Sequence, residues 1–180
     1  MSISELHPHS GPAALLTEAV ALVREAAGAM YAARSDDDLV ATVELTAELR
    51  AALAAVETGV VAEDDHRDLA KTRLAYGSTG DWLTHLGGLR KGDGRRVVAR
   101  AHALTGPLGV TREAMAAGTV SPEQADVIVK STEALPVGEA VRGRGEQALL
   151  EHAGSFMCHA HHIRHWISGG QTKLDNLASR

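Results

Sequence analysis

The chain has 180 residues, enough for one domain with its own core, and 44% of them are hydrophobic. Only 3% are aromatic, so Ala, Leu and Val must fill the interior, which favours close-packed helices over a β-sandwich. No apolar run reaches the about 20 residues of a transmembrane helix, and the single cysteine, Cys158, excludes an internal disulfide and suits a reducing compartment. The first residues do not resemble a secretory signal, and we expect a cytoplasmic protein without membrane contact.

Charge is distributed unevenly along the chain, whose formal net charge is -5. Residues 1–70 hold thirteen Asp and Glu against four Lys and Arg, whereas residues 71–180 hold ten against fourteen. A contact with a polyanion is therefore expected only on the C-terminal part. The alternative is a solvated surface whose charges are unevenly spread.

Apolar residues at helical spacing predict three helices in the first 76 residues. A helix over 12–33 is expected to have Ser10 as its cap. Ser35 and the three aspartates that follow it predict the start of a second helix, over 35–61, and a third covers 63–76. The second helix is expected to bury a stripe of large apolar residues: Leu39, Val43, Leu49, Leu53, Val56 and Val60. The third is expected to carry a solvated charged face: Asp64, Asp65, Arg67, Asp68, Lys71 and Arg73.

Shorter helices separated by glycine-rich breaks are predicted after residue 77. Residues 89–94 and 106–109 form two of the breaks. Ser121, with Pro122 and Gln124, has the pattern of a capping box. The expected helices are 78–89, which buries Trp82, then 95–104, 111–117 (with Thr111 as its cap), 122–134 and 138–153, the last with Val141, Ala148, Leu149 and Leu150 as its apolar face.

Two features of this region suggest contact with DNA. Helices 111–117 and 122–134 have the spacing of a helix-turn-helix unit. The second helix exposes Glu123, Asp126 and Glu133, which a phosphate backbone repels, so DNA reading by this unit is the lesser hypothesis. A group of cations is also able to contact phosphates, although a solvated basic helix is the commoner explanation: Arg90, Lys91, Arg95, Arg96 and Arg100.

The composition changes after Gly154, where Phe, Cys, His, Trp and Gly replace the helix formers. The adjacent His161 and His162 suit metal binding and proton transfer near neutral pH. Cys158, His161 and His165 have C-x₂-H-x₃-H spacing, which supplies three of the four ligands that a closed zinc site needs. The other histidines, among them His66, His85, His102 and His152, are expected at surface or satisfied positions.

The segment from Cys158 to Leu177 resembles the HNH endonuclease motif. The match consists of Cys158, His161-His162-Ile163, Trp166, Gly169-Gly170, Thr172, Leu174 and Asn176-Leu177. The helical part resembles the domain of unknown function that precedes HNH modules in the 13E12 repeat family, through Trp82-Leu83, 99–104, 115–124 and Leu135-Pro136. We therefore predict a mainly α protein, with a multi-helix N-terminal domain over 1–154 and a small, incomplete ββα-metal unit over 155–180.

The resemblance implies hydrolysis of a DNA phosphodiester by a metal-dependent endonuclease. His161 would ligate a divalent metal (Mg, Mn or Zn), and Cys158 would be a ligand of a structural zinc. His162 would be the general base that takes a proton from the attacking water, and Asn176 would fix the loop and orient that base. A neutral imidazole in this role contributes about 10²–10⁴-fold, and a metal stabilises charge on the leaving oxygen.

The sequence departs from the family pattern in its ligand set. HNH motifs continue past the Asn-Leu pair with a helix that carries a further Cys and a His pair, whereas the given sequence ends at Arg180. The resemblance therefore implies a truncated member of the family, possessing an incomplete metal site. Two alternatives stay open: a helical module that binds DNA or a protein partner without catalysis, and a remnant without function.

Overall fold

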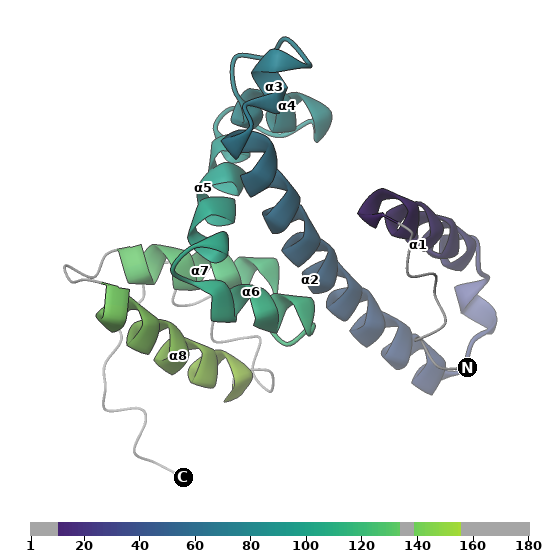
Figure 1. Cartoon of the computed structure of the whole chain (residues 1–180). Helices are drawn as coiled ribbons and strands as arrows, with labels where there is room; N and C mark the ends of the chain where they lie inside the picture. The colour runs from purple at the N-terminus through teal and green to yellow at the C-terminus, as the bar shows by residue number, and fades with distance from the viewer. Residues whose placement is uncertain (1–10, 134–138, 156–180) are drawn as a thin grey trace. The chain divides into compact units, whose positions relative to one another are not determined.

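The computed structural model describes residues 11–133 and 139–155, and every regular element in these ranges is a helix (Figure 1). The prediction of a mainly α protein is confirmed for this part of the chain. The elements are α1 (Pro12–Ala27), η2 (Tyr31–Ala33), α2 (Asp36–His66), α3 (Leu69–Thr72), α4 (Thr79–Leu86), α5 (Asp93–Thr105), α6 (Gly109–Ala116), α7 (Pro122–Glu133) and α8 (Glu139–Ser155). Of the predicted ββα unit over 155–180, Ser155 is the last residue of α8, and residues 156–180 lie outside the described part, so the unit stays a prediction.

Contacts divide the chain into two compact units, Met1–Val43 and Glu44–Arg180. In the first unit, α1 ends at Ala27 and the single 3-10 turn η2 follows, so the predicted helix over 12–33 is broken near Gly28. Gly11 occupies the cap position that was predicted for Ser10, which lies outside the described residues. The Tyr31 hydroxyl donates to the Ala26 carbonyl at 2.6 Å and ties the turn to the helix end.

Helix α2 starts where the sequence predicts, because the Ser35 hydroxyl accepts a hydrogen bond from the Asp38 backbone N–H at 3.2 Å. It continues to His66 instead of ending near Val61. Asp68 then adopts a left-handed conformation with φ of +52°, which separates α2 from the single turn of α3. The predicted third helix over 63–76 is therefore wrong, since its first part belongs to α2.

The buried face of α2 differs from the predicted one. Small residues are buried along it: Ala51, Ala54, Ala55 and Thr58, with Val61 at the end. The large residues predicted to be buried are exposed (Val43, Leu49, Leu53, Val56 and Val60), and Leu39 is half-buried. Alanines let neighbouring helices approach α2 closely, whereas leucines at the same positions would hold them further away.

The core of the second unit lies where α2, α5, α6 and α7 meet. Leu104 of α5 and Met115 of α6 are its largest fully buried apolar side chains. Leu149 and Leu150 of α8 pack against this core as predicted, whereas Ala148 is exposed and the Val141 side chain lies outside the described part. The buried cluster consists of Ala54, Ala55, Leu104, Leu108, Met115, Val120, Ala125, Ile128 and Val129.

Local capping fixes the starts of two further helices. Ser78 accepts from the Asp81 N–H at 3.1 Å at the start of α4. At α7 the predicted capping box is confirmed: Gln124 Oε1 accepts from the Ser121 N–H at 2.8 Å, and Ser121 Oγ accepts from the Gln124 N–H at 3.2 Å. Helix α6 begins at Gly109, so the predicted cap Thr111 instead lies buried inside its first turn.

Helices α4 and α5 cross at two glycines. A Cβ on Gly94 would lie 2.0 Å from the Gly80 carbonyl oxygen, so only glycine fits at this position. Gly94 lies inside α5, although the sequence places it in a break. Trp82 of α4 was predicted to be buried, but its side chain is only half-buried.

Candidate functional site

The predicted catalytic and metal-binding residues lie outside the described residues. These are Cys158, His161, His162 and Asn176, together with His165 of the alternative zinc site. Within 11–133 and 139–155, no group of three or more His, Cys, Asp or Glu is placed to hold a metal ion. The nuclease site therefore stays a prediction from the sequence.

Two of the three acidic residues of α7 are held by arginines from other helices. Glu123 forms an ion pair with Arg50 of α2. Asp126 accepts from Arg100 of α5 at 3.1 Å, and the same guanidinium reaches Glu57 of α2 at 3.2 Å. The Arg100 side chain is only 12% exposed. Through these two ion pairs, Arg100 links α2, α5 and α7. The suggestion that Arg100 contacts phosphates is wrong for this structure, because two carboxylates already occupy it.

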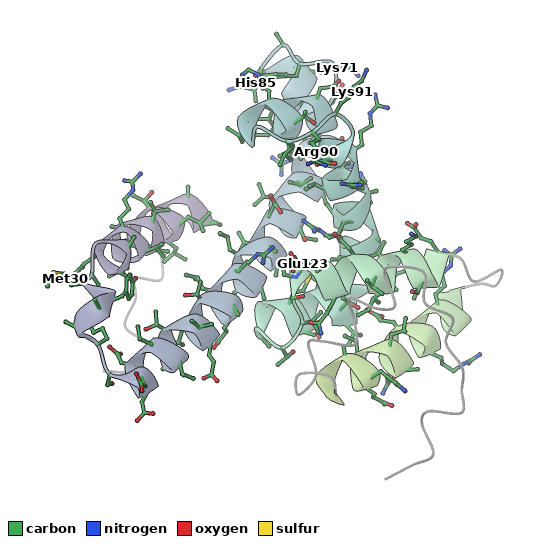
Figure 2. All side chains as sticks on the ribbon, turned by 180° about the vertical axis from the view of Figure 1, so that it is seen from behind. Met30, Lys71, His85, Arg90, Lys91 and Glu123 are labelled. Carbon is green, nitrogen blue, oxygen red and sulfur yellow. The ribbon has the colours of Figure 1, made fainter. Side chains whose placement is uncertain are left out.

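The other predicted cations form an exposed basic surface, which we define as Arg90, Lys91, Arg95 and Arg96. They lie on the turn between α4 and α5 and on the first turn of α5, and Figure 2 labels Arg90 and Lys91 at this end of the unit. Arg96 pairs with Asp93 at 2.5 Å. For Arg90, Lys91 and Arg95, no ion pair with another described residue is present. These three side chains are able to meet an anion without first breaking an internal salt bridge.

Two carboxylates at the C-terminal end of α2 are less solvated than the sequence suggests. Asp64 is buried and accepts from the Thr79 hydroxyl at 3.1 Å, which corrects the prediction of an exposed residue. Asp65 lies 2.7 Å from Nε2 of His102 on α5. The hydrogen bond from His102 lowers the pKa of Asp65 below its ordinary value, although partial burial opposes that shift. His102 is thus a satisfied surface histidine, as predicted.

Glu146 of α8 is a buried acid that the sequence reasoning missed. Its carboxylate accepts from the Thr111 backbone N–H and from the Thr111 hydroxyl, both at 2.7 Å. Thr111 lies in the first turn of α6, where backbone N–H groups lack helical partners and the dipole favours negative charge. Glu146 therefore caps α6 from another helix. No local pattern around residue 146 signals this, because its partner is 35 residues away.

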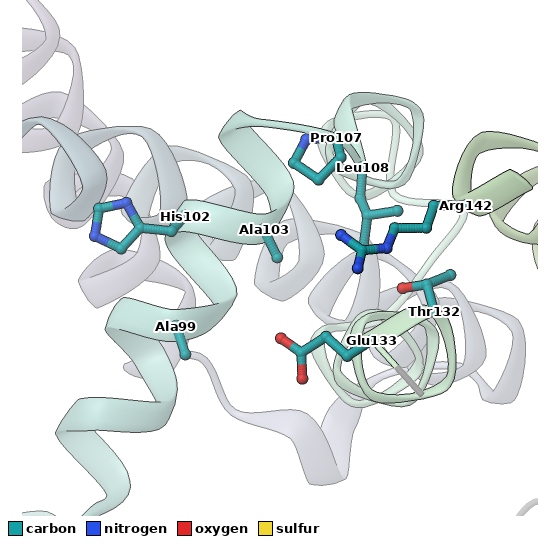
Figure 3. A pocket seen from close by; sticks show the side chains of 8 residues that line it. All are labelled: Ala99, His102, Ala103, Pro107, Leu108, Thr132, Glu133 and Arg142. Atoms are coloured by element: carbon teal, nitrogen blue, oxygen red, sulfur yellow. The ribbon is translucent and has the colours of Figure 1, made fainter. Parts of the chain in front are cut away.

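A pocket of about 370 Å³ opens between α5, α7 and α8 (Figure 3). Its apolar part comes from Ala99, Ala103, Pro107 and Leu108, and its polar part from His102, Thr132, Glu133 and Arg142. The Thr132 hydroxyl already lies 2.8 Å from the Ile128 carbonyl, and the His102 ring is held by Asp65. Among the described lining residues, the hydroxyl and the imidazole are thus already engaged in contacts within the protein.

Comparison with known protein families, with curated proteins and with solved structures finds no match for the chain. Among the described helices, none combines the length and the apolar character needed to cross a lipid bilayer.

Proposed function

We propose that the chain acts on DNA as a metal-dependent endonuclease of the HNH type. The observation that carries the proposal is the motif between Cys158 and Leu177, in which the paired histidines, the double glycine and the Asn-Leu pair occur in HNH order. The basic surface around the start of α5 supports it, since a nuclease that hydrolyses a phosphodiester must hold a polyanion.

The side chains of the motif divide the chemistry between them. His162 would take a proton from the attacking water, and a neutral imidazole is suited to this at neutral pH. Asn176 would hold that imidazole in orientation through its amide. Cys158, with a thiolate, would ligate a structural zinc. His161, with an imidazole nitrogen, would ligate the catalytic divalent metal, and such a donor favours Zn²⁺ or another transition metal over Mg²⁺, which prefers oxygen ligands. Such a metal would supply stabilisation of the charge on the leaving oxygen.

The test is nicking of a supercoiled plasmid by the purified chain with Mg²⁺, Mn²⁺ or Zn²⁺ added separately. We expect nicking with at least one of these metals and a loss of at least 100-fold in His162→Ala, because the base is removed. His152→Ala is the matched control, since His152 is an exposed histidine of α8 outside the motif. Equal nicking by the parent chain and by His162→Ala would refute the proposal, as would the absence of nicking with every metal.

A second candidate is a binding module without catalysis, and the basic surface favours it. Arg90, Lys91 and Arg95 are exposed and have no ion-pair partner among the described residues, so they are available to a polyanion. In this case the chain binds duplex DNA, and His162→Ala changes neither the affinity for the duplex nor the background level of plasmid nicking. The two candidates are therefore separated by the same pair of variants.

A further inference from the structure

The pocket between α5, α7 and α8 combines an apolar wall with two side chains of opposite charge (Figure 3). Ala99 and Ala103 lie one turn apart on α5, and their methyl groups leave open a space that larger side chains would fill. Pro107 and Leu108 continue this wall. The pocket volume of about 370 Å³ lies within the range of small-molecule sites, which pair an apolar lining with a few polar groups.

Arg142 and Glu133 are the polar groups of this lining that remain available to a ligand. The Thr132 hydroxyl and the His102 imidazole are already engaged within the protein. Arg142 is half-buried, and its Nε is buried without a hydrogen-bond partner among the described residues. An unpaired buried donor costs free energy, and a bound anion would satisfy it.

The two charged groups face the same space. In Figure 3 the guanidinium of Arg142 and the carboxylate of Glu133 both point into the pocket, opposite Ala99 and Ala103 of α5. A polyanion would meet the Glu133 carboxylate beside the arginine, and like charges repel. A simple organic cation would leave the guanidinium unpaired. A ligand that carries both charges satisfies both side chains, because guanidinium groups bind carboxylates and carboxylates accept hydrogen bonds from ammonium groups.

We infer that this pocket binds a free α-amino acid with an apolar side chain. The α-carboxylate of the ligand pairs with Arg142, the α-ammonium group pairs with Glu133, and the apolar side chain lies against the alanines of α5. An α-amino acid has this combination, since it carries both charges beside one apolar group. The inference does not depend on the nuclease proposal, because it uses no residue of the motif or of the basic surface.

Isothermal titration calorimetry of the whole chain with L-leucine, L-methionine and L-phenylalanine tests the class of ligand. We expect saturable binding of at least one of them. The same molecule without its amino group, or without its carboxylate, should bind more weakly, because one of the two charged side chains then loses its partner. No binding of any of the three amino acids would overturn the inference, as would equal affinity for either of the two analogues.

Two charge variants test the site. Arg142→Gln should weaken binding of the amino acid about tenfold or more, because the guanidinium is half-buried. Glu133→Gln should weaken it by a smaller factor, since Glu133 is exposed and water screens its ion pair. Arg144→Gln and Glu151→Gln are the matched controls, because both residues are exposed on α8 and do not line the pocket. Unchanged affinity in Arg142→Gln, or equal losses in the controls, would place the ligand elsewhere and contradict the inference.

A steric variant provides an independent check that leaves every charge in place. Ala99 is exposed on α5, so Ala99→Leu should fold, and its longer side chain should occupy part of the pocket and weaken binding. Circular dichroism of each variant shows whether the helices are retained. If a charge variant does not fold, Ala99→Leu decides: affinity equal to that of the parent chain would mean that the amino acid does not bind in this pocket.

Discussion

Gly94 shows how a single missing methyl group determines a helix crossing. Its backbone lies against the Gly80 carbonyl and beside the Thr84 hydroxyl, with the position of an added Cβ only 2.0 Å and 2.5 Å from these oxygens. The nearer oxygen belongs to backbone, which is not able to rotate away as a flexible side chain does. Helices α4 and α5 therefore keep their separation only while residue 94 is glycine.

Gly94→Ala is expected to lower the free energy of unfolding by about 2 kcal/mol or more, because overpacking a tight contact forces the backbone apart. Urea unfolding followed by circular dichroism measures the change. Gly59→Ala is the matched control: Gly59 is also helical, and a Cβ there meets nothing within 4 Å. The free energy of unfolding of this control should rise by up to about 1 kcal/mol, because alanine has a higher helix propensity than glycine. Equal stabilities of the two variants would show that the crossing has room for a methyl group.

At the scale of the helices, three of the starts were predictable because capping is local. Ser35, Ser78 and Ser121 lie where the sequence places the beginnings of α2, α4 and α7, and each accepts a backbone hydrogen bond there. The continuation of α2 into the predicted third helix was missed, although no glycine or proline lies between residues 61 and 63 to end the helix there. Whether a helix continues across such a point depends on tertiary packing.

The buried face of α2 was mispredicted for a physical reason. Size and hydrophobicity favour Leu49, Leu53 and Val56 for the core, but the core uses Ala51, Ala54 and Ala55, which permit close helix packing. A helix with two apolar faces has no single direction of burial in its sequence pattern. The link from Glu146 to Thr111 was equally invisible, because it joins two helices far apart in sequence. The four predicted site residues lie outside the described residues, so their geometry stays untested.

The contact between α2 and α5 is expected to depend on pH through Asp65. Because its pKa is lowered in the folded protein, mainly by the His102 hydrogen bond, Asp65 stabilises the fold above its ordinary pKa of 3.8. This contribution is lost as the pH falls through the lowered pKa. Both side chains are partly exposed, so it should stay below about 1 kcal/mol.

Asp65→Asn should therefore be less stable than the parent chain at pH 6, and the difference should shrink as the pH is lowered from about 4 to 2. Urea unfolding at several pH values gives this difference. Glu113→Gln is the control, because Glu113 is an exposed carboxylate of α6 without an ion pair to another described residue. If the difference in stability between Asp65→Asn and the parent chain stayed constant over the acid range, the stabilising role assigned to ionised Asp65 would be contradicted.

For the molecule as a whole, charge separates along the chain in a way that is compatible with the proposed function. The acidic excess lies in residues 1–70, and the basic excess follows in residues 71–180. Folding removes Arg100 from the available cations by pairing it with Glu57 and Asp126, but leaves Arg90, Lys91 and Arg95 exposed. A DNA contact is therefore expected to centre on the basic surface and to involve few phosphates.

Arg90→Gln/Lys91→Gln should weaken binding to a labelled duplex and flatten its dependence on salt. Each lost phosphate contact removes about 0.9 from the slope of log Kobs against log salt, because fewer counterions are released. Fluorescence anisotropy between about 50 and 200 mM salt measures both slopes. Arg24→Gln/Arg34→Gln removes the same charge from the acidic part of the chain and should leave the slope unchanged. If both double variants lower the slope equally, net charge attracts the duplex and the basic surface is not its site.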